Sequence, residues 1–276
     1  MNLVIQGSDV ATPDLKQLAK LAGASAIEAI TPTAFRLRNA TPNPQIAPYC
    51  ENAHLDCAFV PAERRLADIR LAVMDMDSTL ITIECIDEIA DLQGLKPQVA
   101  AITAAAMRGE LDYPQSLRQR VALLKGLDAG ALQRVYDERL RLSPGAEAML
   151  AKFKQLGIKT LLVSGGFTYF TGRLKDRLNL DYTRSNVLEI ADGKLTGGVI
   201  GDIVDAGVKR AALLQARDGL GLGRDQIIAL GDGANDLKFM SEAGVSVAYH
   251  AKPVVRAQAT YALNYVGLDG VLNLFA

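Results

Sequence analysis

Two aspartates two residues apart, Asp75 and Asp77, are the side chains in this 276-residue chain whose spacing most suggests chemistry. They follow the apolar run Leu71-Ala72-Val73, which is typical of a strand buried on both faces. Because side chains alternate along a strand, the two carboxylates should point the same way. At a few ångströms they repel by about 1–4 kcal/mol, which a shared cation or proton would offset. The alternative is a loop in which Asp75 caps a turn and Asp77 is solvated.

Polar groups also follow two later apolar runs. The segment SGG (164–166) follows the predicted strand 158–163, and GDGAND (231–236) follows the predicted strand 226–230. Alternating β and α segments predict a mostly parallel sheet, and ligands of such sheets bind at the carboxyl ends of the strands. We therefore expect one shared site, to which these turns contribute Ser164, Gly165, Asp232, Asn235 and Asp236.

The residue types at this edge suit a phosphate and a hard metal ion. Asp75, Asp77 and Asp232 offer oxygen ligands of the kind that Mg²⁺ prefers. The glycines beside Ser164 expose backbone N–H groups that can hold an anion, and Lys209 near a predicted helix start can add positive charge. Taken singly, the lysine could be a solvated surface residue and the glycines a tight turn.

Taken together, these groups specify phosphoryl transfer. Asp75 would attack phosphorus and form an aspartyl-phosphate, which divides one difficult displacement into two easier ones. Mg²⁺ and Lys209 would offset the charges of phosphate and carboxylate. Asp77 would protonate the leaving alkoxide and then deprotonate the water that hydrolyses the intermediate.

The elements that must position these groups fall into three parts. Residues 1–68 predict a small α+β domain of βαββ-like order, in which TPNPQIAP (41–48) is a loop. This pattern resembles small amino-acid-sensing domains of the ACT type, and the alternative is an accessory or dimerising module without a ligand. Residues 69–276 predict an α/β core, interrupted at about 82–144 by a helical block placed to act as a lid. Within the core, Asp192-Gly193 predicts a β-hairpin.

Composition narrows the class of partner. Lys plus Arg (30) nearly balances Asp plus Glu (31), which argues against nucleic-acid binding. No apolar run of about 18 residues predicts a membrane span, and no signal peptide is evident at the N-terminus. With three scattered cysteines and two histidines, any metal should be held by oxygen. We expect a cytoplasmic protein that acts on a small-molecule substrate. A homodimer is compatible with the sequence.

Three ordered motifs carry a family resemblance. The segments MDMDSTL (74–80), VSGGF (163–167) and GDGANDLKFM (231–240) resemble successive motifs of the haloacid dehalogenase superfamily. Within it, the chain from about Leu71 to Val266 is similar to the phosphoserine phosphatases, most specifically in ECIDEIA (84–90), QSLRQRVALL (115–124) and KLTGGVIGDIV (194–204). The resemblance implies a Rossmann-like parallel sheet with an inserted helical cap. It also implies Mg²⁺-dependent hydrolysis of O-phospho-L-serine, the last step of serine biosynthesis.

The resemblance also implies a role for each matching core residue. Asp75 is the nucleophile and Asp77 the general acid/base. Mg²⁺ would be held by the Asp75 carboxylate, the Asp77 backbone carbonyl and Asp232. The remaining core roles are phosphoryl binding for Ser164, Gly165 and Lys209, substrate proximity for Asn235, and support of metal and lysine for Asp236.

In the cap, the resemblance assigns the amino-acid part of the substrate. Glu84 would meet its ammonium group and Arg120 its carboxylate, which suits a guanidinium that can grip a carboxylate with two hydrogen bonds. Met107 and Tyr113 would be apolar walls. Without the resemblance, Glu84 and Arg120 would be read as a solvated helix face. Met76 replaces the aromatic residue often found between the two aspartates of the family.

Two other functions fit parts of the pattern. A phosphotransferase would pass the phosphoryl group from Asp75 to an alcohol instead of water. A non-enzymatic amino-acid sensor could retain the fold, but the intact set of Asp75, Asp77, Lys209 and Asp232 argues against it. An ATP-driven pump with similar chemistry is excluded because no membrane spans are predicted.

Overall fold

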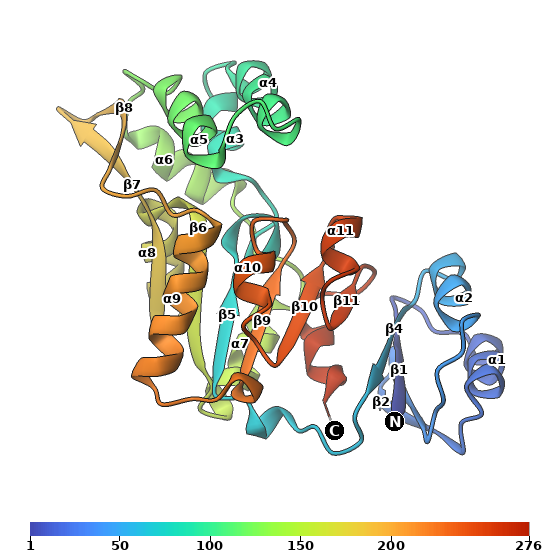
Figure 1. The fold of residues 1–276 in the computed structure, drawn as a ribbon. Helices are drawn as coiled ribbons and strands as arrows, with labels where there is room; N and C mark the ends of the chain where they lie inside the picture. Colours follow the sequence, from blue (N-terminus) through green and yellow to red (C-terminus); the bar gives the residue numbers. More distant parts are fainter. Residues whose placement is uncertain (276) are drawn as a thin grey trace. The chain divides into compact units, whose positions relative to one another are not determined.

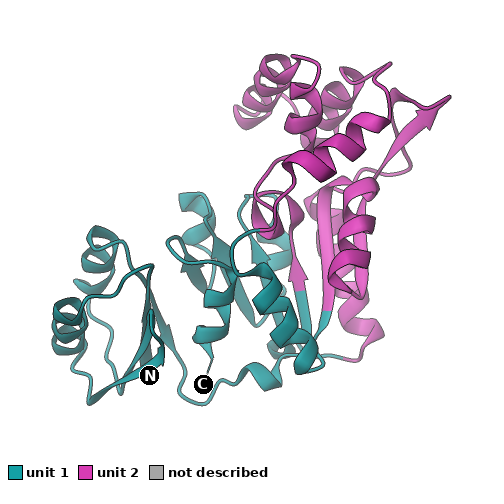
Figure 2. Cartoon of the chain, turned by 180° about the vertical axis from the view of Figure 1, so that it is seen from behind, with its two compact units in different colours: residues 1–72, 143–159, 222–276 teal, residues 73–142, 160–221 magenta. Residues whose placement is uncertain are grey.

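The structure, a computed structural model, describes residues 1–275 and divides them into two compact units. One unit comprises residues 1–72, 143–159 and the chain from 222 onward; the other comprises residues 73–142 and 160–221 (Figure 2). No helix among the described residues is long and apolar enough to cross a membrane.

The first sixty residues build a four-stranded antiparallel sheet in the order β2-β3-β1-β4. With its two helices this is the β-α-β-β-α-β order of ferredoxin-like units. Its helices cover a core that includes Leu3, Ile5, Leu18 and Leu37. The elements are β1 (Asn2–Gln6), α1 (Thr12–Ala22), β2 (Ala26–Thr31), β3 (Ala34–Arg38), α2 (Ile46–Asn52) and β4 (Asp56–Val60).

Helix α2 is the element of this sheet unit that the sequence analysis did not predict. The segment 41–48 was expected to be a loop, yet α2 begins inside it at Ile46. Pro48 lies in the first turn of α2, where backbone N–H groups have no partner within the helix. A proline-rich segment can therefore start a helix, and the βαββ-like pattern gains a second helix.

The four-stranded sheet is tied to the C-terminal part of its own unit by a buried carboxylate. Asp56 in β4 is 3% exposed and accepts backbone N–H groups from Asn264 at 2.7 Å, Tyr265 at 2.9 Å and Val266 at 3.2 Å. The domain boundary expected at residue 68 stays a prediction. The hydrogen bonds of Asp56 join residues before and after this boundary, and both groups belong to one compact unit.

The second sheet has seven strands in the order β11-β10-β9-β5-β6-β7-β8 (Figure 1). The pairs β6/β7, β9/β10 and β10/β11 are parallel, and β7/β8 is antiparallel. The predicted α/β class is confirmed. The strands are β5 (Leu71–Met74), β6 (Lys159–Phe167), β7 (Tyr182–Ala191), β8 (Lys194–Ile200), β9 (Ile227–Gly231), β10 (Val245–Tyr249) and β11 (Tyr261–Leu263).

The predicted hairpin joins β7 to β8. Its two turn residues, Asp192 and Gly193, have φ values of 50° and 73°. Positive φ at both positions is what a two-residue hairpin turn of type I′ requires, and Asp-Gly adopts it readily. The hairpin prediction is therefore confirmed for a physical reason that is local to two residues.

Besides α1, α2 and the helices of the block between β5 and β6, further helices accompany the strands of the seven-stranded sheet. In the first unit they are α7 (Ala146–Gln155), α10 (Leu237–Met240) and α11 (Pro253–Arg256), with short 3₁₀ turns at Leu66–Asp68, Arg224–Gln226 and Leu268–Leu274. In the second unit they are α8 (Thr168–Leu178) and α9 (Ala206–Gly219).

The helical block expected between the first two core strands is present in the second unit. It contains α3 (Cys85–Asp91), α4 (Lys96–Met107), α5 (Tyr113–Ala122), α6 (Gly130–Arg134) and a wide turn at Val135–Arg139. The chain enters and leaves the block side by side, because Ile81 and Leu142 form an antiparallel bridge. We call residues 82–144 the cap, and these bounds remain a prediction.

Candidate active site

Asp75 directly follows β5 and makes a buried ion pair. The backbone is still extended at Asp75 (φ −72°, ψ 162°), and a wide turn over Met76–Leu80 comes next. Oδ1 of Asp75 accepts the Met76 N–H at 2.7 Å and lies 2.8 Å from Nζ of Lys209. The side chains of Lys209 and Asp75 are 1% and 8% exposed. The structure thus brings a candidate nucleophile and a cation together.

Helix α9 positions Lys209. Its first residue follows Asp205, whose Oδ1 accepts the Val208 N–H at 2.9 Å, a standard N-terminal cap. Lys209 lies in the first turn of this capped helix, and its own N–H donates to the Asp205 carbonyl at 2.9 Å. The cap therefore fixes the start of α9 and, through it, the origin of the buried lysine side chain.

Asp77 is held by two donors from different segments. Its Oδ1 accepts the Cys85 N–H at 3.0 Å, and its Oδ2 accepts the Ser164 hydroxyl at 3.4 Å. Withdrawal from water, and then the negative charge of Glu84, raise the pKa of Asp77 to about 7. A carboxyl group with this pKa can both give and take a proton near neutral pH.

The turn after the second core strand packs tightly around Ser164. This serine is fully buried, and its Oγ accepts the Gly166 N–H at 2.8 Å. A Cβ atom on Gly166 would lie 2.7 Å from Oδ2 of Asp77, so only glycine allows this close approach. We expected the strand to end at residue 163; instead β6 runs on to Phe167, and α8 begins at Thr168.

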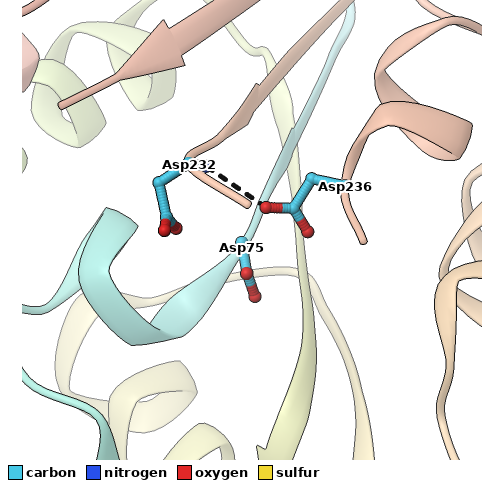
Figure 3. A group of neighbouring side chains, drawn as sticks. All are labelled: Asp75, Asp232 and Asp236. Atoms are coloured by element: carbon cyan, nitrogen blue, oxygen red, sulfur yellow. Dashed lines mark hydrogen bonds between the residues drawn. The ribbon is translucent and has the colours of Figure 1, made fainter. Parts of the chain in front are cut away.

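Three carboxylates gather where a metal ion could bind. Oxygen atoms of Asp75, Asp232 and Asp236 all lie within 4.8 Å of one another (Figure 3). A donor set of carboxylate oxygens alone fits a hard divalent cation rather than a soft one. The site can therefore hold a divalent metal.

Asp236 also shapes the turn that carries Asp232. Its Oδ2 accepts the N–H groups of Asp232 at 3.2 Å and Gly233 at 3.0 Å, and the side chain is fully buried. Exposed Asn235 donates its Nδ2 to Oδ1 of Asp236 at 3.3 Å. We expected Asp236 to support the metal and Lys209; its carboxylate is also one of the three that could hold a metal ion, and its role stays a prediction. A backbone-carbonyl ligand at Asp77 stays a prediction.

Helix α5 of the cap begins at a capping box and carries two candidate residues. Asp112 Oδ1 accepts the Gln115 N–H at 2.7 Å, and the Gln115 side chain accepts the Asp112 N–H at 3.0 Å. Tyr113, expected as an apolar wall, donates its hydroxyl to the Gly165 carbonyl at 3.2 Å. Half-buried Arg120 follows two turns later and donates its Nε to the Ser116 carbonyl at 3.4 Å.

The other two cap candidates have different surroundings. Glu84 precedes α3, and its Oε1 accepts the Ser78 hydroxyl at 2.7 Å. Met107 ends α4 and is 70% exposed. Glu84 is thus tied to the turn that follows Asp75, whereas nothing among these contacts brings Met107 to the site. Their substrate-binding roles stay predictions.

Sequence reasoning missed three groups that organise this site. They are the Cys85 N–H on Asp77, the Asp205 cap of α9 and Asn186, which is considered below. An aspartate directly before a helix is a recognisable cap signal, so Asp205 could have been found. The other two are contacts to or from backbone N–H and C=O groups, eight residues apart for Cys85 and Asp77 and 18 and 21 residues apart for Asn186, and no sequence pattern indicates them.

Comparison with family models identifies two matching regions. Residues 69–244 match the haloacid dehalogenase-like hydrolases. Residues 3–46 match a domain of unknown function, DUF4072. The first match contains Asp75, Asp77, Lys209, Asp232 and Asp236.

Individual relatives share both sequence and fold with the chain. Phosphoserine phosphatase of Polaromonas sp. (strain JS666 / ATCC BAA-500) is 59% identical over 215 residues, which cover 76% of this chain and 91% of that protein. A probable phosphoserine phosphatase from Vibrio cholerae, solved without ligand, has a TM-score of 0.87 and 37% identity over 99% of this chain and 86% of that one. A substrate-bound phosphoserine phosphatase structure has a TM-score of 0.70 and 36% identity over 75% of this chain and 99% of that one.

Proposed function

The chain belongs to the phosphoserine phosphatases among the haloacid dehalogenase-like hydrolases, and we propose that its reaction proceeds through an aspartyl-phosphate on Asp75. Mg²⁺ is the proposed metal, and the proposed role is the last step of serine biosynthesis. The observation that carries the mechanism is the 2.8 Å contact between Oδ1 of Asp75 and Nζ of Lys209, both buried. This contact supports the proposal because a cation beside the carboxylate can neutralise a phosphoryl group.

In the first step, a carboxylate oxygen of Asp75 attacks phosphorus. The bond from phosphorus to the serine oxygen breaks, and the proton held by Asp77 passes to that oxygen. The raised pKa of Asp77 supports this role, because the carboxyl group must be protonated when the alkoxide leaves. Acid catalysis of this kind accelerates a reaction by about 10²–10⁴-fold.

In the second step, Asp77 is a carboxylate and accepts a proton from water. The water oxygen attacks phosphorus, and the bond from phosphorus to Asp75 breaks. Asp75 returns as a carboxylate, Asp77 regains its proton, and inorganic phosphate leaves with the oxygen from water. Ser164, whose hydroxyl contacts Asp77 at 3.4 Å, lies where it can orient the phosphoryl oxygens.

Charge compensation makes the approach of two anions possible. Lys209 provides one buried positive charge beside Asp75. A divalent cation held by Asp75, Asp232 and Asp236 would supply further positive charge to the phosphoryl oxygens. These positive charges would offset part of the negative charge of the carboxylates and of the bound phosphoryl group.

We propose that Arg120 binds the carboxylate of the substrate and that Glu84 binds its ammonium group. The substrate is inferred from the relatives, which are phosphoserine phosphatases. Arg120 and Glu84 give the cap one charge of each sign, as the recognition of a zwitterion requires. Arg120 projects from a helix whose first residue, Tyr113, contacts the Gly165 carbonyl. We call residues 164–166, at the end of β6, the phosphate turn. The cap can therefore bind the amino-acid part while the core binds the phosphate.

Two substitutions test the order of the steps. Asp75→Asn should abolish hydrolysis of phosphoserine and form no labelled protein from a ³²P-labelled aryl phosphate. Asp77→Asn should slow phosphoserine hydrolysis by at least about 10²-fold but accumulate labelled protein from the aryl phosphate, whose leaving group needs no acid. Rapid turnover by Asp75→Asn would contradict the nucleophile assignment. Assays with and without Mg²⁺ test the metal.

Product analysis distinguishes hydrolysis from transfer. Free phosphate should appear in equal amount to the serine released, even when serine or homoserine is offered in excess as acceptor. A phosphorylated acceptor as the main product would show that an alcohol competes successfully with water for the intermediate, and would overturn hydrolysis as the main reaction.

A further inference from the structure

Asn186 in β7 is a buried polar side chain for which the mechanism above has no role. It is 1% exposed, yet both ends of its amide are hydrogen-bonded. Nδ2 donates to the Gly165 carbonyl at 2.8 Å, and Oδ1 accepts the Val204 N–H at 2.8 Å. A buried amide that spends both its donor and its acceptor on backbone groups fixes those groups relative to each other.

The two segments that Asn186 joins are those proposed to hold the phosphoryl group. Gly165 follows Ser164 at the end of β6. Val204 immediately precedes Asp205, the capping residue of the helix that carries Lys209. These segments are separated by about forty residues in sequence, and a single side chain bridges them within one compact unit.

The hydrogen bond from Asn186 to Gly165 also affects the orientation of the Ser164 hydroxyl. A peptide group is planar, so holding the Gly165 carbonyl fixes the direction of the Gly166 N–H. That N–H donates to Oγ of Ser164 at 2.8 Å, and the serine hydroxyl in turn donates to Asp77 at 3.4 Å. The orientation of the Ser164 hydroxyl therefore depends on the Asn186 amide.

The same carbonyl accepts the Tyr113 hydroxyl from the cap at 3.2 Å. A carbonyl oxygen has two lone pairs and can satisfy both donors. The two donors differ in origin, since Tyr113 belongs to the cap and Asn186 to the core sheet. Asn186 is the donor that lies in the strand next to β6 in the same sheet.

We propose that Asn186 is a positioning residue that sets the spacing between the Ser164 hydroxyl and the Lys209 ammonium for a phosphoryl group. The inference rests on the proposed function in one respect, namely that the phosphoryl group binds between these residues. Replacement of Asn186 by an apolar residue leaves the Gly165 carbonyl with one partner fewer and the Val204 N–H without this acceptor.

The test compares Asn186→Ala with Ser185→Ala in the full chain with Mg²⁺. Ser185 is the neighbouring residue of β7, is 8% exposed, and shares a 2.7 Å hydrogen bond with Thr171 away from the phosphate turn. Inorganic phosphate is the probe, its Kd measured by titration calorimetry. Thermal unfolding reports the structural effect of each variant.

We expect Asn186→Ala to raise the phosphate Kd about tenfold and to lower kcat/KM about equally for phosphoserine and an aryl phosphate. The equality follows because both substrates bring the same phosphoryl group. Ser185→Ala should lower Tm but change the phosphate Kd by less than about twofold. A fall in Tm for Asn186→Ala with unchanged Kd and kcat/KM would reduce Asn186 to a structural role and overturn the proposal.

A second variant covers the case in which Asn186→Ala does not fold. Asn186→Leu keeps the approximate size of the side chain and adds no charge, but it loses both the donor to Gly165 and the acceptor for Val204. It should also weaken phosphate binding, and wild-type affinity in this variant would contradict the proposal. If the wild-type chain did not hydrolyse phosphoserine, the proposed function would fail, while the comparison of phosphate Kd values would still decide the role of Asn186.

Discussion

Nζ of Lys209 lies 2.8 Å from Oδ1 of Asp75, and the two side chains are almost completely buried. Asp75 directly follows β5, which comes first in sequence among the strands of the seven-stranded sheet, whereas Lys209 comes from a helix more than a hundred residues later. The pair joins the proposed nucleophile to the charge that offsets a bound phosphoryl group.

Lys209→Ala should lower kcat/KM for phosphoserine by about 10²–10³-fold, the usual effect of removing one group that stabilises developing charge. Steady-state kinetics on the purified variant measure the change. Lys154→Ala, at an exposed position of α7, is the control and should keep wild-type activity. Near-normal turnover by Lys209→Ala would mean that the buried pair serves only the fold.

Arg120→Ala should lower kcat/KM for phosphoserine about 10–100-fold, because a hydrogen-bonded contact between charged groups contributes about 1.5–3 kcal/mol. An aryl phosphate has no carboxylate for Arg120 to bind, so its kcat/KM should change little. Arg118→Ala, exposed on the same helix, is the matched control. Equal losses on both substrates would argue against contact between Arg120 and the substrate carboxylate.

The β7–β8 hairpin should control the position of α5. Backbone hydrogen bonds join the hairpin to the segment that follows α5. The Gly126 N–H donates to the Leu195 carbonyl at 2.8 Å, and the Leu195 N–H donates to the Leu127 carbonyl at 2.9 Å. Gly197 in this hairpin has φ of 85°, and a Cβ there would lie 3.0 Å from Cβ of Lys125 and 3.3 Å from Ala122. A Cβ at this position would therefore require Lys125 or Ala122 to shift by a few tenths of an ångström.

Gly197→Ala should therefore move α5 and lower kcat/KM for phosphoserine through Arg120, in addition to destabilising the protein by about 1–3 kcal/mol. Gly201→Ala is the matched control, since Gly201 has φ of 76° but no atom within 4 Å of a Cβ. It shares the backbone strain without the clash, so its Tm should fall while its kcat/KM stays normal. Identical kinetics for the two variants would contradict the coupling.

A group of ion pairs around Glu88 in the cap should contribute less to stability in acid. Nη1 of Arg139 lies 2.6 Å from Oε2 of Glu88 and 2.6 Å from Oδ2 of Asp91, and Nζ of Lys96 lies 3.2 Å from Oε1 of Glu88. Burial opposes ionisation of Glu88, but the hydrogen bonds from Arg139 and then Lys96 outweigh it and lower the pKa of this carboxyl group.

A lowered pKa in the folded state means that the unfolded chain binds the proton more readily. The stability contributed by Glu88 is therefore present above its ordinary pKa, about 4.3, and is lost as pH falls through the lowered value. Chemical denaturation at pH 7 and at pH 3 measures the loss. Arg139→Ala should reduce the difference, whereas Arg134→Ala, exposed on α6, should preserve it.

Local signals in the sequence predicted much of the fold. The Asp192-Gly193 turn, the alternation of strands and helices, and the helical block after β5 all depend on residues close together in the chain. The helix at Ile46–Asn52 was missed because its proline suggested a loop, although a first-turn proline is compatible with a helix. The extension of β6 beyond its predicted end at residue 163, to Phe167, is a difference of a few residues.

For the site, the sequence by itself determined which chemistry was available. Aspartates, glycines and a serine at strand ends, with a lysine near a helix start, indicated phosphoryl transfer because parallel strands end at one edge. The tertiary structure decided which groups meet: Lys209 with Asp75, Asp236 with the two other carboxylates of the candidate metal site, and Asn186 with Gly165 and Val204. The physical reason is that these contacts join segments far apart in sequence, several through backbone groups that every residue carries, so only the packed chain can select them.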